Sequence, residues 1–414
     1  MNQIELLAPA GGMEQMKAAC RFGADAVYGG LPRFGLRAFA DNFNENNFAE
    51  AVSFMHDAGK KFYITLNLLP SDTDMEGFLE VAEFAHKAGV DAAIVSDLGA
   101  MSMIHQKIPD LPLHVSTQAN VLNSFTANHL HQTLGVERIV LSRELDFDSI
   151  AKFRQNIPDS LELEAFVHGA MCMAYSGRCL LSNALSGRSG NRGACSQPCR
   201  WKYHVVEEKR PGEYLPIFED EEGTHLFSAY DLCMLDYLPE MVKSGITSFK
   251  IEGRMKTAYY VASVISVYRH ALDLLAKSEN DFYAALPNLK IELDKASHRK
   301  SNTGFYFGQP LPVAGADGFL QSMQYVGDVV QAATEDKPAV VRLKNRFFVG
   351  DPLEVLTPNG SIPFTATEIT LVDTLEKVEK VTVAGTLLYH PMPEGSMPGD
   401  LLRGPNPKLK KQQG

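Results

Sequence analysis

Four of the six cysteines in this chain of 414 residues lie in one short segment, with the spacing C-x6-C-x15-C-x3-C. They are Cys172, Cys179, Cys195 and Cys199. Glycine and serine are frequent around them, and this composition favours a loop over a regular helix or strand. Four thiols that converge in a loop bind a metal or an iron–sulfur cluster in a cytosolic protein, whereas they form disulfides in a secreted one.

The cellular compartment decides between these chemistries. The amino-terminal sequence MNQIELLAPAGG has no basic start and no apolar run before a cleavage site. No stretch approaches the roughly 18 apolar residues of a membrane span. We therefore expect a cytoplasmic protein with reduced thiols and no membrane partner. Zinc commonly takes two close cysteine pairs, and only Cys195 and Cys199 are close, so the spacing favours an iron–sulfur cluster over zinc or ordinary buried thiols.

Two further residues bear on this metal site. Arg178 lies inside the first cysteine pair, where it could offset the negative charge of a four-thiolate cluster and donate hydrogen bonds to sulfur. Cys233 lies between Leu232 and Met234, so we expect it in the core. It is the reserve ligand if one of the four clustered cysteines is not used.

The elements that must position these residues follow a repeating order. Apolar strand-like runs alternate with helical patterns, which predicts βα units. Eight such units predict a TIM-type (β/α)8 barrel, an α/β fold with its active site at the carboxyl ends of the strands. A doubly wound sheet usually has fewer strands, and no GxGxxG follows the first strand. The eight runs are residues 4–10, 25–30, 60–67, 91–97, 111–117, 137–144, 161–169 and 248–254.

Charged residues end the eighth predicted strand. Lys250, Glu252 and Arg254 alternate along it, so their side chains point to the same side. Barrel interiors are mostly apolar, and three charges at one strand end therefore suit a polar ligand. A dicarboxylate would suit Arg143, Lys250 or Arg254, because guanidinium groups bind carboxylates bidentately.

Other strand ends supply further candidate site residues. Ser116 and Gln118 follow the fifth strand, although capping of the next helix would also explain them. Arg143 and Glu144 follow the sixth strand, and a simple ion pair at the barrel rim is the alternative for these two. His168 ends the seventh strand, directly before the cysteine segment.

The chain is predicted to have two parts. Residues 1–310 form the barrel, with an insertion at about 170–245 after the seventh strand that carries the cysteines and a β-hairpin at 202–228. Short alternating strands at 311–414 predict a small antiparallel β-barrel. Its stretch VRLKNRFFVGD sets basic beside aromatic residues, which suits RNA contact as well as an ordinary solvated strand face. The net charge of −11 argues against a generally basic nucleic-acid binder, but a local basic face is enough to contact phosphates.

Several motifs resemble those of a known family. The run EAFVHGAMCMAYSGRCLLS at 164–182 resembles the signature of the collagenase-like unassigned peptidase family 32. The motifs ELLAPAG, AVYGG, HVSTQAN and SFKIEGRMK resemble the same family, as does the carboxy-terminal region. The resemblance covers essentially the whole chain, and it is strongest to a bacterial subgroup that helps convert the wobble uridine of tRNA to 5-hydroxyuridine.

This resemblance implies a tRNA substrate, prephenate as co-substrate and a [4Fe-4S] cluster, in a hydroxylation without molecular oxygen. Other members hydroxylate a ribosomal RNA cytidine or a ubiquinone precursor, and collagenase-like members gave the family its peptidase name. Some relatives act with a paralogous partner subunit, so such a partner stays open here.

The residues themselves favour hydroxylation over peptide hydrolysis. A protease needs a nucleophile with a base, or an activated water, and the chain has neither HExxH nor G-x-S-x-G. His168 lies four residues before Cys172, so a cysteine–histidine dyad is the peptidase alternative. That dyad would leave three clustered cysteines unexplained, whereas a cluster uses all four.

We predict that Cys172, Cys179, Cys195 and Cys199 together bind one [4Fe-4S] cluster. Each single Cys→Ala variant should lose iron and sulfide, because a cluster of this kind takes four thiolates. Iron and acid-labile sulfide after anaerobic purification are the measurement, with Cys20→Ala as the matched control. A variant that keeps its full iron content removes that residue from the ligand set, and Cys233→Ala is then the next to measure.

Overall fold

The computed structural model describes most of the chain, in eight segments. These are residues 4–36, 40–172, 179, 181–200, 218–220, 223–225, 230–308 and 320–407, and for 200, 218–220 and 223–225 it describes the backbone alone.

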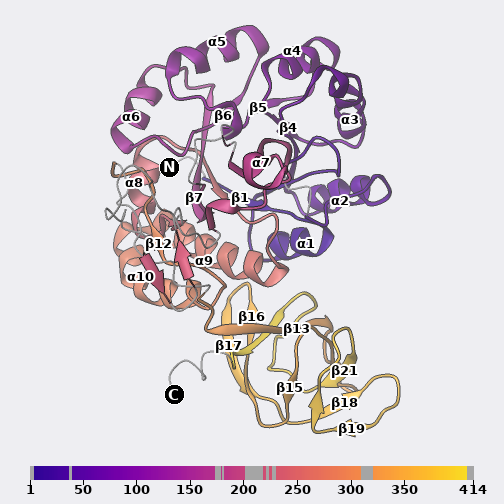
Figure 1. Cartoon of the computed structure of the whole chain (residues 1–414). Coiled ribbons are helices and arrows are strands. Elements are labelled where there is room, and N and C mark those ends of the chain that lie inside the picture. The colour runs from indigo at the N-terminus through magenta and orange to yellow at the C-terminus, as the bar shows by residue number, and fades with distance from the viewer. Residues whose placement is uncertain are drawn as a thin grey trace, which may run out of the picture.

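Eight parallel strands form a closed barrel at the centre of the larger part of the molecule (Figure 1). Each strand pairs with the next along the chain, and β11 pairs with both β7 and β1, which closes the ring. The predicted TIM-type barrel is therefore confirmed, and each of the eight predicted runs contains one of its strands. The strands are β1 (Glu5–Pro9), β2 (Ala26–Gly29), β3 (Lys61–Leu66), β4 (Ala92–Val95), β5 (Leu113–Val115), β6 (Arg138–Val140), β7 (Glu162–Ala170) and β11 (Ser248–Ile251).

Helices surround the barrel because each strand turns one set of alternating side chains outward. In β7, for example, Leu163, Ala165 and Val167 belong to the large apolar core shared with the helices. Polar side chains such as Asn44, which forms a capping box, begin several helices. The helices between the strands are α1 (Met13–Arg21), α2 (Glu45–Asp57), α3 (Met75–Lys87), α4 (Leu98–Lys107), α5 (Ser124–Leu134), α6 (Phe147–Gln155) and α8 (Leu238–Lys243).

The inward set of side chains is more polar than the predicted apolar layers. A small apolar cluster includes Leu7, Tyr28 and Tyr63. Beside it, Glu164 and Lys250 are buried inside the barrel and form an ion pair. Charged groups therefore occupy space that aliphatic side chains fill in most barrels of this type.

The insertion between β7 and β11 contains the cysteines and short elements. β10 (Asp231–Cys233) pairs antiparallel with the end of β7, and β12 (Ser301–Asn302) adds to β10. β8 (Phe218–Asp220) and β9 (Gly223–His225) form a hairpin inside the predicted range 202–228, and the rest of that range lies largely outside the described residues. The short helix α7 (Leu181–Ser186) lies between the second and third cysteines.

Two helices follow the barrel, where one long helical pattern runs in the sequence. α9 (Ala258–Lys277) and α10 (Glu279–Leu293) are separated at Ser278, whose backbone is extended. The Ser278 hydroxyl accepts a hydrogen bond from the backbone N–H of Asp281, so it caps the start of α10. The serine ends one helix and begins the other, and the chain can turn between them.

The carboxy-terminal part forms an antiparallel sheet beside α9 and α10 (Figure 1). Two shorter strands, β15 (Phe347–Phe348) and β20 (Lys380–Val381), pair with each other. The main sheet contains, in spatial order, β17 (Gly360–Thr365), β16 (Pro352–Thr357), β22 (Leu401–Pro405), β13 (Met323–Gln331), β14 (Ala339–Leu343), β21 (Leu387–His390), β18 (Ile369–Leu371) and β19 (Lys377–Val378).

The stretch predicted to contact RNA has structural partners for several of its side chains. Arg342 pairs with Asp328 at 2.7 Å, and Lys344 pairs with Glu14 of the barrel part at 2.7 Å. Phe347 is buried in the core of the sheet, whereas Phe348 is partly exposed. Fewer of its side chains are therefore available to contact RNA than the sequence suggested. RNA contact by this stretch stays a prediction.

Arg403 connects the two parts of the chain. Its guanidinium is fully buried and donates hydrogen bonds to Glu354 of β16 and to Glu292 of α10, at 2.9 and 2.6 Å. Lys295 pairs with the same two carboxylates. Tyr259 of α9 also stacks on Tyr325 of β13. Buried ionic and aromatic contacts therefore hold the sheet against α9 and α10.

Among the described residues, no helix combines the length and apolar character that crossing a membrane requires.

We predict that Arg403→Met destabilises the protein by about 3 kcal/mol, because it removes the fully buried one of the two cations that pair with Glu292 and Glu354. The unfolding midpoint in urea is the measurement. Lys377→Met is the control, since Lys377 and Glu368 form an exposed pair that contributes about 1 kcal/mol or less. Equal effects of the two substitutions would contradict a special role for Arg403.

Candidate functional site

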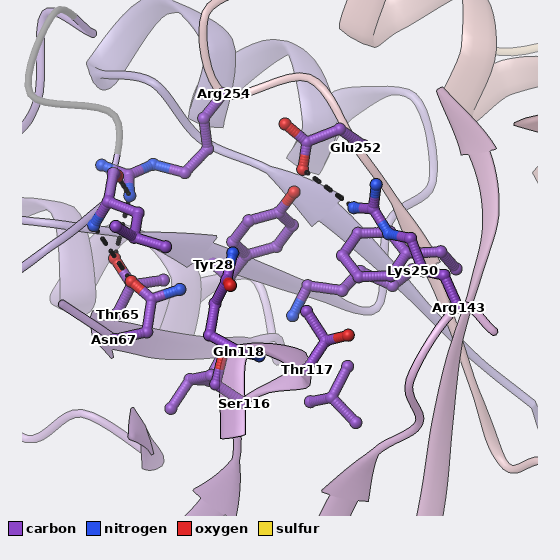
Figure 2. A pocket seen from close by; sticks show the side chains of 14 residues that line it. Tyr28, Thr65, Asn67, Ser116, Thr117, Gln118, Arg143, Lys250, Glu252 and Arg254 are labelled. Atoms are coloured by element: carbon purple, nitrogen blue, oxygen red, sulfur yellow. Dashed lines mark hydrogen bonds and ion pairs between the residues drawn. The ribbon is translucent and has the colours of Figure 1, made fainter. Parts of the chain in front are cut away.

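A polar pocket opens at the carboxyl ends of the barrel strands (Figure 2). About 460 Å³ within it is free of protein atoms, and part of this space is open to solvent. The structure brings together six of the predicted site residues in its wall: Ser116, Gln118, Arg143, Lys250, Glu252 and Arg254. The remaining lining residues are Tyr28, Leu36, Thr65, Asn67, Ile94, Thr117, Val140 and Phe166.

Lys250 lies at the inner end of this pocket. It is 4% exposed, and its ammonium donates a 2.6 Å hydrogen bond to Glu164, which is fully buried. The ammonium also lies 4.2 Å from the centre of the Tyr28 ring, close enough for a cation–π interaction. These contacts hold the positive charge of Lys250 in one place.

Arg143 has a donor that the described residues do not satisfy. One guanidinium nitrogen donates to the carbonyl of Ala170 at 2.9 Å, and another lies 3.8 Å from a carboxylate oxygen of Glu252. The guanidinium stacks on Phe166, 3.9 Å from the ring centre. Its Nε is buried and, within the described chain, has no hydrogen-bond partner. A buried N–H of this kind favours a bound acceptor such as a carboxylate.

Arg254 is held by the wall of the pocket. It is 3% exposed and donates to the carbonyl of Leu36 at 2.7 Å, to the hydroxyl of Thr65 at 2.9 Å and to the side-chain oxygen of Asn42. These acceptors are neutral, so its charge still contributes to the potential of the pocket. Because the same bonds tie three segments together, Arg254 combines a structural role with any contact to a ligand.

The Ser116–Gln118 segment forms a short turn at the end of β5. Ser116 is 2% exposed, and its hydroxyl accepts from the backbone N–H of Gln118, so the capping alternative for Ser116 is observed. Gln118 lines the pocket from this turn. Asn67 faces it from the end of β3, where its side-chain oxygen accepts from the N–H of Leu36.

Two neighbours of Lys250 were absent from the predicted site. Tyr28 is the third residue of the AVYGG motif, and its hydroxyl donates to the carbonyl of Ile251. Glu164 begins the EAF motif and bonds to Lys250. The sequence could have identified Glu164, because it is the one carboxylate in the otherwise apolar run LEAFV and a buried charge requires a partner.

His168 lies outside this pocket. It lines a second cavity with Cys233 and His298, and its Nδ1 lies 3.3 Å from the Tyr268 hydroxyl. Burial lowers the pKa of His168 to about 4, so the ring is neutral at pH 7. Its described ring contacts are with Tyr260 and Tyr268. The His168 side chain therefore lines a different cavity from Lys250 and Glu252, although the backbone N–H of Glu252 donates a 2.9 Å hydrogen bond to the carbonyl of His168.

The cysteine segment packs on the same end of the barrel as the first pocket. Arg192 forms a 2.9 Å ion pair with Asp74 and also donates to the carbonyl of Leu69, both from the segment that follows β3. Figure 1 shows α7 in front of the barrel strands. The predicted site residue Arg178 lies outside the described residues.

None of the four cysteines forms a disulfide within the described chain. Cys172 is exposed, and Cys179, Cys195 and Cys199 are partly buried. The donor set therefore suits a cluster in its chemistry, with four reduced cysteines in one segment. Within the part of the chain that the structure describes, no three metal-binding side chains lie close enough to form a site. Binding of a cluster would accordingly require the thiols to move closer together. Cys233, the reserve ligand, lies opposite His168 in the β7–β10 pair and faces the second cavity.

Comparison with known families covers nearly the whole chain. The sequence profile of peptidase family U32 matches residues 11–313, and that of the peptidase family U32 C-terminal domain matches residues 321–403. The two matched regions correspond to the barrel with its following helices and to the antiparallel sheet.

Curated relatives carry names from two chemistries. The tRNA hydroxylation protein P of Escherichia coli is 36% identical over 415 residues, covering 88% of each chain. An uncharacterized protease of Methanocaldococcus jannaschii is 42% identical over 310 residues, covering 74% of each chain. The 23S rRNA 5-hydroxycytidine C2501 synthase of Escherichia coli is 34% identical over 375 residues, covering 89% of this chain and 55% of the synthase.

We predict that His168 makes stability depend on pH. Its folded-state pKa of about 4 lies below the ordinary 6.5, so the unfolded chain binds more protons between these values. His168 should therefore cost up to about 3 kcal/mol of stability as the pH falls from 6.5 to 4. The free energy of unfolding, measured in urea, should fall less steeply over this pH range for His168→Phe than for wild type. His129→Gln, at an exposed histidine, is the control. Parallel curves for wild type and His168→Phe would contradict this assignment.

Proposed function

The chain belongs to peptidase family U32, and we propose that it is an RNA-modifying enzyme that hydroxylates a nucleoside of tRNA. One observation carries this proposal, which is the similarity over 88% of both chains to a protein named for tRNA hydroxylation. The similarity to a ribosomal RNA 5-hydroxycytidine synthase supports the same class of reaction on a pyrimidine of RNA.

The finer reaction that we propose is conversion of the wobble uridine to 5-hydroxyuridine without molecular oxygen, with prephenate as co-substrate. The electrostatics of the pocket support an anionic ligand. Arg143, Lys250 and Arg254 bring three cationic groups, against the carboxylates of Glu252 and Glu164. The net charge of these five groups is positive. The Nε of Arg143, which has no hydrogen-bond partner within the described chain, suits one carboxylate of a dicarboxylate.

The residues of the pocket have separate roles in this proposal. Arg143 and Lys250 bind and orient the anion, and the Glu252 carboxylate, close to Arg143, is placed to accept a proton from it. The amides of Asn67 and Gln118 supply hydrogen-bonding groups of the kind that distinguish nucleobases. A base must leave its stack to reach such a pocket, which is least costly in a single-stranded loop.

We propose that Cys172, Cys179, Cys195 and Cys199 bind a [4Fe-4S] cluster. The absence of disulfides among these cysteines in the described chain and the packing of their segment on the barrel end that bears the pocket support this assignment. A cluster bound there would supply electron-transfer chemistry next to the anion site. The experiment below expresses this chain alone and therefore also tests whether it needs a paralogous subunit.

Peptide hydrolysis is the second candidate, because one relative is named a protease. A thiol protease needs a cysteine beside a histidine that can take its proton. The described contacts of the His168 ring are with tyrosines in a buried cavity, whereas Cys172 is exposed. This arrangement gives the peptidase less support than the anion pocket gives the hydroxylase.

We predict that this gene, expressed in an Escherichia coli strain that lacks tRNA hydroxylation protein P, restores 5-hydroxyuridine-derived nucleosides to tRNA during growth without oxygen. Arg143→Met should reduce restoration about ten- to a hundredfold at limiting prephenate, because it removes a charge-assisted contact, and excess prephenate should partly recover it. Mass spectrometry of tRNA digests is the measurement.

The control for this experiment is Lys107→Met, which removes one positive charge from the exposed end of α4. Unmodified tRNA together with gelatin cleavage that depends on Cys172 would favour the peptidase. Hydroxycytidine in ribosomal RNA in place of modified tRNA would move the proposal to the other RNA substrate.

A further inference from the structure

A chain of alternating charges runs through the interior of the barrel toward the pocket. Arg138 of β6 contacts Glu5 of β1 at 2.5 Å and Glu164 of β7 at 3.2 Å. Glu164 in turn accepts a 2.6 Å hydrogen bond from Lys250 of β11. The two oxygens of Glu164 therefore bind different cations, Oε2 with Arg138 and Oε1 with Lys250.

This chain is buried along its length. Arg138 and Lys250 are each 4% exposed, and Glu164 is fully buried. Burial of single charges costs several kcal/mol unless each is paired and hydrogen-bonded. Arg138 pairs with three carboxylates, those of Glu5, Glu162 and Glu164. It therefore holds Glu164 in place from the side away from Lys250.

Only the last member of the chain reaches the pocket. Lys250 lines it beneath Tyr28, whereas Glu164 and Arg138 lie behind it in the barrel and do not line it. The carboxylate that neutralises Lys250 is thus placed on the side away from the ligand. The remaining N–H groups of the ammonium are left for the Tyr28 ring and for a bound acceptor.

We propose that Glu164 is a positioning residue, which holds the Lys250 side chain in place and directs its ammonium into the anion pocket. The inference rests on the proposed function for the identity of the anion, prephenate. Without the Glu164 carboxylate, the Lys250 ammonium would lose the charge-assisted hydrogen bond that fixes it and would be free to leave its place under Tyr28. The pocket would then lose the cation at its inner end, although Glu164 itself never touches the ligand.

The test uses Glu164→Gln with Glu162→Gln as a matched control. Glu162 lies two residues earlier on the same strand and also bonds Arg138, but its side chain is half exposed and lies behind the pocket. Prephenate binding to the purified full chain is measured by calorimetry. We expect Glu164→Gln to lose about tenfold in affinity, because the neutral amide weakens the charge-assisted hydrogen bond that orients the Lys250 ammonium. Glu162→Gln should stay within about twofold of wild type, as expected for an exposed charge.

A purely structural role would change stability and leave the affinity of the folded protein for prephenate unaltered. Wild-type affinity in Glu164→Gln, or equal losses in both variants, would overturn the inference. The pairing is measured without ligand in a cycle of Lys250→Met, Glu164→Gln and the double variant, followed by urea unfolding. The double variant should be more stable than Lys250→Met alone, which leaves Oε1 of Glu164 without its cation, and additive effects would overturn the pairing.

The two proposals can fail separately. If wild type binds no prephenate, the prephenate part of the proposed function fails, and the comparison of the two variants is repeated with inorganic phosphate as the anion. A wild-type protein that binds neither anion overturns the anion pocket and with it the role assigned to Glu164.

Discussion

The parallel pairing of β7 with β11 closes the barrel across the whole cysteine-bearing insertion. Its register sets Ser248 opposite Glu164 and Lys250 opposite Phe166. Residues far apart in the chain thereby become neighbours inside the barrel, including the pair of Glu164 and Lys250. The same closure places the start of the insertion at the carboxyl end of β7, on the face that bears the pocket. The charge chain, the pocket and the position of the cysteines all depend on this pairing.

A barrel interior built from ions costs stability that an apolar interior would not. Buried ion pairs gain little over well-packed apolar groups of similar volume, because desolvation offsets the attraction. Arg138 nevertheless pairs with three carboxylates, including that of Glu5. Glu5 also accepts a hydrogen bond from Tyr63; burial raises the pKa of Tyr63, whereas Glu5 stays ionised. Rigid placement of a cation at the inner end of the pocket is a function that aliphatic side chains cannot supply.

The family name and the pocket point to different chemistries. Peptidase family U32 is named for peptide hydrolysis, which needs a nucleophile and a base in contact. The polar pocket instead gathers cations around a small cavity and has no described thiol in its wall. Small basic pockets suit anionic ligands, so the geometry agrees better with the relatives named for RNA hydroxylation than with those named for proteolysis.

The sequence alone determined the barrel and the charged residues that line its pocket. Alternating apolar runs and helical patterns are local properties, and eight of them leave few arrangements besides a closed barrel. The same reasoning placed Ser116, Gln118, Arg143 and the charges at the end of β11 in one site, because the carboxyl ends of all strands meet at one face of the barrel. The long helical pattern after the barrel was less informative, since a single serine, Ser278, divides it.

Only the tertiary structure decided which of these charges are free for a ligand. Arg254 donates hydrogen bonds to Leu36, Thr65 and Asn42 in the wall of the pocket. Arg143 stacks on Phe166, and its buried Nε has no hydrogen-bond partner within the described residues. His168 belongs to another cavity because the end of β7 pairs with β10 and packs on α9. The partner of Lys250 lies 86 residues earlier in the chain, on another strand. Pairing across such distances depends on strand register and side-chain direction, and local sequence patterns carry no record of either.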